Sequence, residues 1–156
     1  MDILLDTTDL QILELMQDNA RLSNADLARE LGMAASAVLE RVKKLEQKQV
    51  ILQYNTIINP AALKQKLLAF IFIKSKDDID SDTDITSALA AIPQVQEVHQ
   101  IAGEDCFLVK IRTEDPSSLM ELMRHSIKKI PGIISTKTTI VLETTKEKNQ
   151  LPIPKK

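Results

Sequence analysis

The sequence predicts an α+β protein of two parts, an N-terminal winged helix-turn-helix and a C-terminal ferredoxin-like unit with the element order β-α-β-β-α-β. Two observations indicate this fold class. Apolar residues recur every three or four positions through residues 6–47, which is the spacing of short helices with one buried face. From residue 67 onward, strand-like apolar runs are separated by two helical patterns. The pattern changes at Asn59-Pro60, a pair that ends regular structure.

The change of pattern divides the chain into four expected segments. Residues 1–59 form the winged helix-turn-helix, residues 60–66 are a linker, and residues 67–146 form the ferredoxin-like domain. Residues 147–156 are polar and rich in proline, so we expect a tail that is frayed or docked on a partner.

Composition excludes several classes of protein. The chain has 156 residues with 20 Lys and Arg against 22 Asp and Glu, a net charge of −2, so binding to nucleic acid requires a local basic patch. Its acidic start lacks the features of a signal peptide. The longest apolar run, Leu67–Ile73, is far shorter than the roughly 20 residues of a membrane span. With a single cysteine, Cys106, we expect a cytoplasmic protein with no membrane partner.

Start and stop signals delimit the first two helices. Residues 6–18 are expected to be helical, because Leu10, Leu13 and Met16 line one side at a spacing of three and acidic residues suit the positive end of the helix dipole. Ser23 is a natural N-cap for a second helix over residues 23–31, and Asp26 occupies the N3 position of a weak capping box. Gly32 then ends this helix, since glycine adopts positive φ freely.

The third helix carries the positive charge of its domain. Val38, Val42 and Leu45 are spaced to face inward on the first two helices. Residues 33–49 hold four basic and two acidic residues, whereas residues 1–60 hold six basic and nine acidic ones. A polar, basic face opposite an apolar one is what insertion into the major groove of DNA requires. The pattern indicates DNA binding, and a plain three-helix bundle with a solvated charged face is the alternative.

The rest of the chain predicts one wing and the ferredoxin-like elements. Val50–Ile58 is β-prone and is expected to form a small hairpin or wing. The acidic residues 77–84 are expected to form a solvated loop, with Asp84 capping the helix that follows. The expected strands cover residues 67–75, 95–101, 106–112 and 134–143, and the expected helices cover residues 85–92 and 116–130, the second with Asp115 as N-cap and Pro116 at N1.

Catalytic and metal-binding roles find little support. His99, His125 and Cys106 are too few and too scattered for a structural zinc site. Cys106 and His99 fall on neighbouring expected strands, but a nucleophile also needs an orienting group and an oxyanion site. Glu104 and Asp105 are adjacent in a turn, which is ordinary loop chemistry. We expect no enzyme activity, no cofactor and no metal site.

Three stretches resemble the Lrp/AsnC (feast/famine) family of bacterial and archaeal transcription regulators. They are LDTTDLQILELMQDNARLSNADLARELGMAASAVLERVKKLEQKQVI, HQIAGEDCFLVKIR and IPGIISTKTTIVLE, and the resemblance covers about residues 4–146. It implies an N-terminal domain that binds double-stranded DNA in a sequence-specific manner. It also implies a C-terminal domain that forms homodimers, assembles them into octamers or related rings and binds a small effector such as an amino acid.

The resemblance assigns roles to individual residues of the first domain. Residues 25–44 match the helix-turn-helix of the family. Ala34 and Ala35 stand where the family commonly has Ser-Pro, so the third helix lacks a capping hydroxyl, a loss of about 1 kcal/mol, unless Ser36 caps it two positions later. The implied DNA-contacting residues are Asn24, Ser36, Ala37, Glu40, Arg41, Lys43 and Lys44.

The second domain departs from the family at one position of the implied effector loop. The family commonly has Gly-x-x-Asp there, and this chain has Gly103 followed three residues later by Cys106. A carboxylate can pair with the ammonium group of an amino acid and a thiol cannot, so we expect an altered ligand preference or a weaker affinity. The implied effector-binding residues are Ile101, Ala102, Gly103, Glu104, Asp105 and Cys106.

Two other functions remain as alternatives. The same β-α-β-β-α-β order serves RNA-binding domains, but those stack bases on aromatic residues within a basic, glycine-containing signature that is absent here. Phe70, Phe72 and Phe107 are therefore interpreted as core or dimer interface. The other alternative is a stand-alone amino-acid-binding module that does not regulate DNA.

Overall fold

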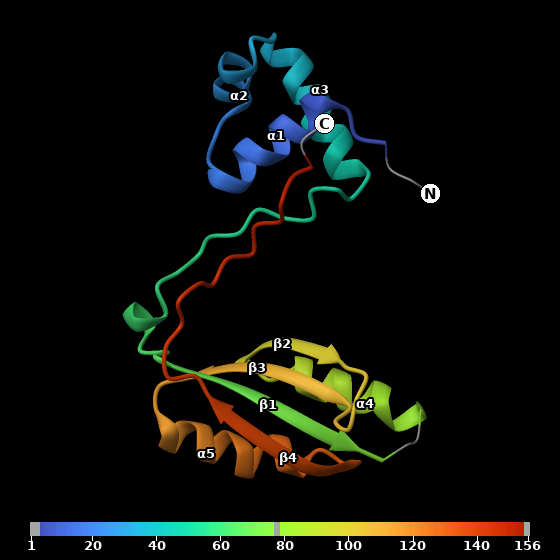
Figure 1. Ribbon diagram of the computed structural model, residues 1–156, viewed down its shortest axis with the longest axis vertical. Helices are drawn as coiled ribbons and strands as arrows, with labels where there is room; N and C mark the ends of the chain where they lie inside the picture. The colour runs from blue at the N-terminus through green and yellow to red at the C-terminus, as the bar shows by residue number, and fades with distance from the viewer. Residues whose placement is uncertain (1–3, 77–78, 155–156) are drawn as a thin grey trace. The chain divides into compact units, whose positions relative to one another are not determined.

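The computed structural model describes residues 4–76 and 79–154. They form two compact units, each drawn in Figure 1. The helical unit comprises residues 1–57 together with residues 147–156, and the sheet unit comprises residues 58–146. In the described part of the chain, no helix is both long enough and apolar enough to cross a membrane.

Three short helices make up most of the helical unit: α1 (Thr7–Asp18), α2 (Asn24–Leu31) and α3 (Ala35–Gln47). Their core contains Ile12 from α1, Leu27 from α2 and Val38 from α3, each fully buried. The predicted inward spacing of the third helix is confirmed, because its three apolar positions all lie in this core. This packing fixes α3 by its apolar face and leaves its polar face toward solvent.

Both predicted boundaries of α2 are present in the structure. The Ser23 hydroxyl accepts the Asp26 N–H at 3.1 Å, and the Asp26 carboxylate accepts the Ser23 N–H at 3.1 Å. These two bonds form the capping box that the sequence predicts. Gly32 follows with φ of 63°, the left-handed conformation that turns the chain toward α3.

The small hairpin expected over residues 50–58 is wrong, although the domain matches the winged helix-turn-helix class in its helices. Residues 50–58 form no strand in the part that the structure describes. The N–H groups of Val50 and Ile51 instead donate to the Leu45 carbonyl at 2.9 and 3.2 Å, closing the end of α3. Beyond them the chain is extended, with Leu52 and Ile57 exposed. β-prone residues become a strand only where a partner strand supplies hydrogen bonds, and residues 50–58 have none of their own.

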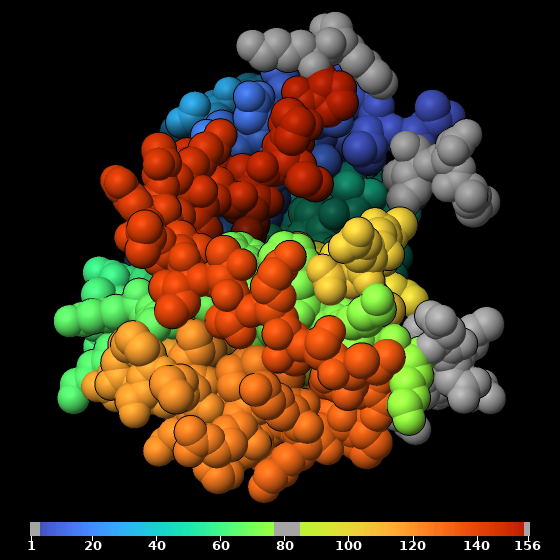
Figure 2. Space-filling view, turned by 60° about the horizontal axis from the view of Figure 1, so that its bottom comes forward, coloured from blue at the N-terminus to red at the C-terminus, as the bar shows by residue number. Residues whose placement is uncertain are grey.

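The sheet unit has the predicted β-α-β-β-α-β order. Four antiparallel strands are arranged as β2-β3-β1-β4. They are β1 (Leu67–Ser75), β2 (Val95–Gln100), β3 (Phe107–Thr113) and β4 (Ile133–Ile140), with helices α4 (Ile79–Ala90) and α5 (Pro116–His125). Both helices pack on one face of the sheet, since Ile85, Leu89, Leu119 and Met123 share a core with Ile71 and Val109. The surface of α5 comes forward in orange in Figure 2.

Three element boundaries of this unit differ from the prediction. Helix α4 begins at Ile79, so Asp84 lies inside it and does not cap it. Residues 77–78 of the predicted loop lie outside the described residues. Carboxylates near a helix start are stabilised by the dipole, which makes an acidic helix start resemble a loop in sequence. Helix α5 ends at His125 and continues only as a 3-10 turn, η2 (Ile127–Lys129). The expected linker contains another such turn, η1 (Pro60–Leu63), capped by Asn59.

The face of the sheet opposite the helices is partly apolar. Phe70, Phe72 and Leu108 are half-buried there, and Phe72 pairs directly with Leu108 across β1 and β3. Lys137 of β4 places its ammonium group 4.8 Å from the centre of the Phe72 ring. Because side chains alternate along a strand, this face is distinct from the core that the helices cover.

The C-terminal tail docks on α1 of its own chain. The Leu151 N–H donates to Gln17 Oε1 at 2.8 Å, and Gln17 Nε2 donates to the Leu151 carbonyl at 3.1 Å. Gln150 Nε2 donates to the Gln17 carbonyl and to Asp18 Oδ1 at 2.9 and 3.0 Å. Figure 1 shows the chain after β4 ending beside α1. The last segment of the chain is therefore part of the helical unit.

Candidate nucleic-acid interface and effector loop

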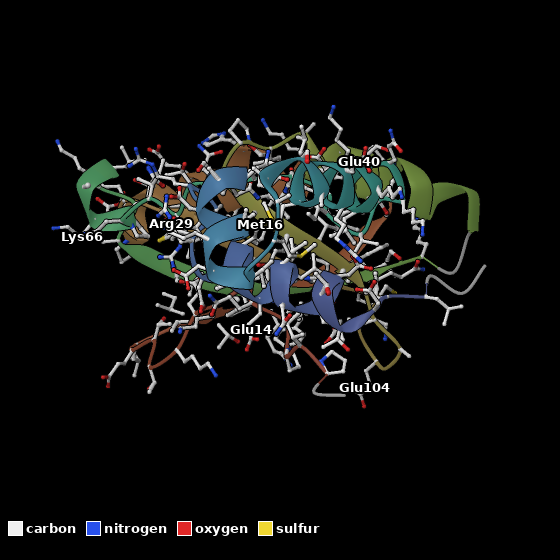
Figure 3. All side chains as sticks on the ribbon, turned by 90° about the horizontal axis from the view of Figure 1, so that it is seen from above. Glu14, Met16, Arg29, Glu40, Lys66 and Glu104 are labelled. Atoms are coloured by element: carbon white, nitrogen blue, oxygen red, sulfur yellow. The ribbon has the colours of Figure 1, made fainter. Side chains whose placement is uncertain are left out.

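The exposed side of α3 presents the polar residues that the sequence predicts. Ser36, Glu40, Lys43 and Lys44 are exposed, and Ala37 is half-buried beside them. Figure 3 shows Glu40 pointing outward from this helix. Two cations and a carboxylate on one helix face can contact phosphates and base edges of a duplex. Of the predicted residues on the preceding helix, Asn24 is half-buried at the first position of α2.

The start of α3 lacks a side-chain cap. Ala34 is the N-cap residue, with φ of −72° and ψ of 139°, and no hydrogen bond from a described side chain caps the helix. The suggestion that Ser36 caps the helix two positions later is therefore wrong. The Ala37 and Val38 N–H groups donate to the Ala34 carbonyl, at 3.0 and 3.2 Å. The backbone alone holds the first turn of this helix.

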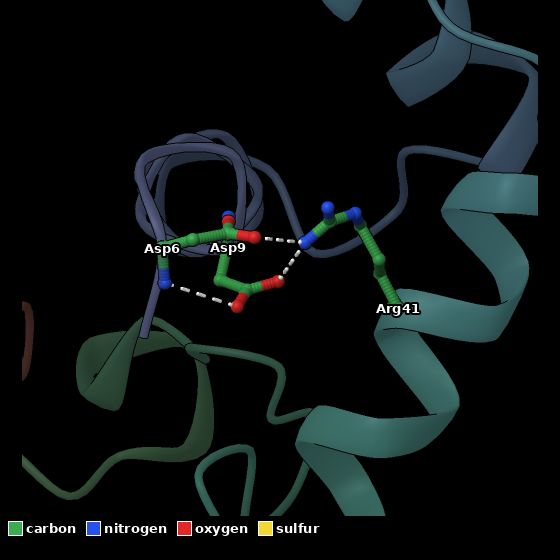
Figure 4. A network of polar contacts seen from close by, with 3 residues as sticks. All are labelled: Asp6, Asp9 and Arg41. Atoms are coloured by element: carbon green, nitrogen blue, oxygen red, sulfur yellow. Dashed lines mark hydrogen bonds and ion pairs between the residues drawn. The ribbon is translucent and has the colours of Figure 1, made fainter. Parts of the chain in front are cut away.

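Arg41 differs from the other predicted contacts because its guanidinium is already engaged. Its Nη1 donates to Asp6 Oδ2 at 2.7 Å and to Asp9 Oδ1 at 2.8 Å, both from the start of α1 (Figure 4). The Arg41 side chain is only 32% exposed, and that of Asp9 17%. The neighbouring guanidinium helps to lower the pKa of Asp6, after the larger effect of the Asp9 N–H. Both Asp6 and Asp9 raise the pKa of Arg41.

A groove of about 420 Å³ lies between the start of α1 and the side of α3. Its lining joins carboxylates from α1 with cations from α3. The lining residues are Leu5, Asp6, Asp9, Ala37, Glu40, Arg41, Lys44, Leu45 and Lys48. Sequence reasoning did not predict this junction, because Arg41 is 32 and 35 residues from its two partners. The available signal was an aspartate pair at a helix start in a chain whose third helix is basic.

The predicted effector residues form the connection between β2 and β3. The Ile101 N–H donates to the Cys106 carbonyl at 2.9 Å, and the Cys106 N–H donates to the Ile73 carbonyl of β1 at 2.8 Å. Ala102, Gly103 and Glu104 are exposed, and Figure 3 shows Glu104 on this loop. A Cβ atom built on Gly103 meets no atom within 4 Å. The tip of the loop is thus open, and its base is fixed to the sheet.

The Cys106 side chain belongs to the base of the loop. It is half-buried and packs against the core of the sheet unit. The Ser75 N–H donates to its sulfur at 3.5 Å. Asp105 is half-buried. His99 contacts Glu97 on its own strand at 3.2 Å, so its contact is separate from that of the thiol.

A second ion-pair group on the open sheet face also escaped sequence reasoning. The Lys110 ammonium group donates to Glu97 Oε1 at 3.0 Å, and its side chain is 13% exposed. Partial burial raises the pKa of Glu97, but His99 and Lys110 outweigh it and the net shift is downward. Within the described residues, no group of three or more His, Cys, Asp or Glu side chains is placed to hold a metal ion.

Comparison with known proteins agrees with both halves of this description. Residues 5–51 match a family model described as winged helix-turn-helix DNA-binding, and residues 68–151 match one described as the Lrp/AsnC ligand binding domain.

Curated relatives and solved structures cover nearly the whole chain. The chain is 33% identical to the leucine-responsive regulatory protein of Haemophilus influenzae, covering 94% of this chain and 89% of that protein. It is 35% identical to the HTH-type transcriptional regulator FL11 of Pyrococcus horikoshii, covering 98% and 99%. A transcriptional regulator from Neisseria meningitidis, solved as its complex with L-Met, superposes with a TM-score of 0.91 at 26% identity, covering 96% and 97%.

These matches decide between the functions that the sequence left open. The relatives are transcription regulators and not enzymes, and the family match favours a DNA-binding regulator over an RNA-binding domain or a stand-alone ligand-binding module. The α+β fold, with a helix-turn-helix followed by a ferredoxin-like domain, is that of the same family. The chain belongs to the Lrp/AsnC family of DNA-binding transcription regulators.

Proposed function

We propose that this regulator binds double-stranded DNA through the exposed face of α3 and is regulated by a small effector bound at the Ile101–Cys106 loop. In this proposal residues 1–59 are the DNA-binding domain and residues 60–66 the linker. Residues 67–146 are the oligomerisation and effector-binding domain, and residues 147–156 the tail. The observation that carries it is the polar, basic face of a helix whose opposite face is locked into a core. A regulator that acts on chromosomal DNA works in the cytoplasm of a bacterial or archaeal cell.

The DNA surface divides by chemistry. Lys43 and Lys44 contact phosphates, because ammonium groups on the flank of a recognition helix meet the backbone on either side of the groove. Ser36, Ala37 and Glu40 face the base edges, with Asn24 of α2 beside them. Arg41 lies at the edge of this surface with its guanidinium held by α1.

The phosphate contacts are tested by the salt dependence of DNA affinity. The probe is a duplex selected by the native protein from a random library. Lys43→Ala or Lys44→Ala is expected to weaken binding to all duplexes and to reduce the salt slope by about one. Lys128→Ala, which removes an exposed cation from the sheet unit, is the matched control. Unchanged affinity and slope in a folded Lys43→Ala, Lys44→Ala double variant would refute the proposed surface.

The effector loop takes its support from the family match and from its open tip. One related regulator is known as an L-Met complex, so an amino acid is the ligand class that we propose. The Cys106 thiol packs against the core, so backbone groups around Gly103 are left to bind the ligand carboxylate. Calorimetric titration with each of the twenty amino acids tests this, with Gly103→Trp and Cys106→Asp as variants. Tight binding that survives Gly103→Trp would place the pocket elsewhere.

The open sheet face supports assembly. Phe70, Phe72 and Leu108 form a partly apolar surface on the side away from both helices, and such a surface is commonly covered by a second copy. We propose a homodimer made through this face. Dimers would then assemble into octamers, as in the family the sequence resembles. A two-fold dimer doubles the length of DNA that is read and matches a palindromic site.

A further inference from the structure

The two carboxylates at the start of α1 and Arg41 of α3 form one closed network. Asp6 Oδ1 accepts the Asp9 N–H at 2.8 Å, and Asp9 Oδ2 accepts the Asp6 N–H at 3.2 Å. These bonds make the capping box of α1. The other oxygen of each carboxylate accepts Nη1 of Arg41 (Figure 4). Every oxygen of the pair therefore has a partner, and the cation that completes the set comes from the recognition helix.

The position of Arg41 on α3 fits a role inside the domain. Val38 and Leu45, three residues before and four residues after it, are both buried in the core. Residues at these spacings share a helix face, so Arg41 stands at the border of the buried face. Lys43 is exposed on a different side of the same helix. A phosphate could engage Nη1 only if Arg41 left two carboxylates, one of them mostly buried.

The network is also a polar connection between the start of α1 and the side of α3. Apolar contacts in the core set which face of α3 is buried, but they have no direction of their own and leave the rotation of the helix only approximately fixed. Charge-assisted hydrogen bonds are directional and short. A guanidinium held at both carboxylates adds a directional restraint on the rotation of α3 about its own axis, and with it on the direction in which Ser36 and Glu40 point.

We infer that Arg41 is a positioning residue of the DNA-binding domain, which orients the recognition helix through Asp6 and Asp9 and does not contact DNA phosphate. The inference rests on the proposed DNA-reading role of α3. The inference predicts an effect on DNA affinity that is opposite to the one expected from net charge alone. Removal of a negative charge from a DNA-binding domain ordinarily tightens binding, whereas here removal of either carboxylate weakens it.

The test compares four variants on a duplex selected by the native protein from a random library. Asp9→Asn and Arg41→Ala are both expected to lower affinity by about fivefold, with no change in salt slope, because an orienting ion pair is lost and no phosphate contact is. Lys44→Ala, which lines the same groove, is expected to reduce the slope by about one. Glu14→Gln, which removes an exposed charge elsewhere on α1, is expected to leave affinity unchanged or slightly tighter.

Two further measurements separate positioning from general damage. Asparagine keeps the shape of aspartate, and its amide oxygen can still accept the Asp6 N–H from the N3 position of the capping box. Asp9→Asn is therefore expected to retain the fold, and circular dichroism checks this. The double variant Asp9→Asn, Arg41→Ala is expected to bind DNA no more weakly than Arg41→Ala alone, because both changes remove the same ion pair between Asp9 and Arg41. Arg41→Lys is expected to restore part of the affinity.

Opposite results would overturn the inference. Tighter or unchanged binding in Asp9→Asn, with a reduced salt slope in Arg41→Ala, would make Arg41 a phosphate contact. Amide hydrogen exchange tests this contact without DNA, since Arg41→Ala is expected to speed exchange in the first turn of α1 and beside Arg41 in α3. Unchanged exchange would refute the role of the Arg41 contact with Asp6 and Asp9, whatever the result of the DNA measurements. Failure of the native protein to bind any duplex would instead refute the proposed function.

Discussion

Tyr54 is the single tyrosine of the chain, which has no tryptophan. Its hydroxyl donates a hydrogen bond to Glu46 Oε1 of α3 at 2.8 Å. Partial burial and the nearby carboxylate both disfavour the phenolate, and together they raise the pKa of Tyr54 to about 12. The residue therefore reports on the end of α3 without interference from other aromatic groups that ionise.

The alkaline titration of Tyr54 is the first prediction. Absorbance at the phenolate wavelength is expected to rise with a midpoint near pH 12 in the native protein. A raised pKa in the folded state means that the stabilising contribution is complete below the ordinary value of 10 and is lost as the pH rises through about 12. Glu46→Gln is expected to lower the midpoint toward 10. A native midpoint near 10 would show that the contact does not form in solution.

At the scale of single elements, the start of α3 lacks the side-chain cap that the described starts of α1, α2 and α5 have. Helices α2 and α5 both begin with side-chain caps, from Ser23 and Asp115, whereas Ala34 provides none. Ala34 already has the extended backbone of an N-cap residue, with φ of −72° and ψ of 139°. A hydroxyl added there would accept an unpaired N–H of the first turn.

Ala34→Ser is therefore expected to stabilise the helical unit by about 1 kcal/mol. Urea denaturation followed by circular dichroism measures the change in the free energy of unfolding. Ala35→Ser, one position into the helix, is the matched control and is expected to be neutral or slightly destabilising, because serine is a poorer helix former than alanine. Equal effects of the two variants would contradict the capping argument.

The elements that the sequence predicted well are those whose ends are set locally. The capping box of Ser23 and Asp26 and the cap of Asp115 involve residues three apart, so a short window contains all the information. Residues 50–58 were predicted wrongly because strand formation depends on a partner that a window does not contain. The predicted start of helix α4 is too late in the chain, because a run of acidic residues is compatible with both a solvated loop and a helix start.

The candidate site shows the same division. The exposed face of α3 follows from helical periodicity and was predicted residue by residue. The engagement of Arg41 could not be predicted, because it depends on how α1 and α3 pack. The orientation of Cys106 is similar, since its contact with Ser75 joins residues 31 apart.

For the whole molecule, the open sheet face makes an assembly prediction. Leu108→Asp places a carboxylate among Phe70 and Phe72, so we expect it to shift a dimer to monomers, which light scattering detects as a halved mass. Met120→Asp changes an exposed apolar residue of α5, 60% accessible and on the other side of the sheet, and is expected to leave the mass unchanged. A native monomer at micromolar concentration would refute the proposed dimer.

The hydrogen bonds between the C-terminal tail and the end of α1 lead to a second prediction for the whole molecule. Deletion of residues 147–156 removes four hydrogen bonds to α1. These bonds are solvent-exposed, so we expect a modest loss of about 1 kcal/mol from the free energy of unfolding of the helical unit. Gln17→Ala removes the two bonds made by the Gln17 side chain and is expected to reproduce about half of the loss. A deletion with no effect on hydrogen exchange at the end of α1 would show that the tail does not dock.

Because the tail lies in the helical unit, that unit is discontinuous in sequence, and the sheet unit is inserted into it between residues 57 and 147. Gln150 and Leu151 are synthesised 133 and 134 residues after their partner Gln17. The three helices can fold early, but the DNA-binding unit makes its full set of contacts only after the sheet unit has been synthesised. A fragment cut at the linker therefore lacks part of its own domain, and a peptide of residues 147–156 is the piece that would complete it.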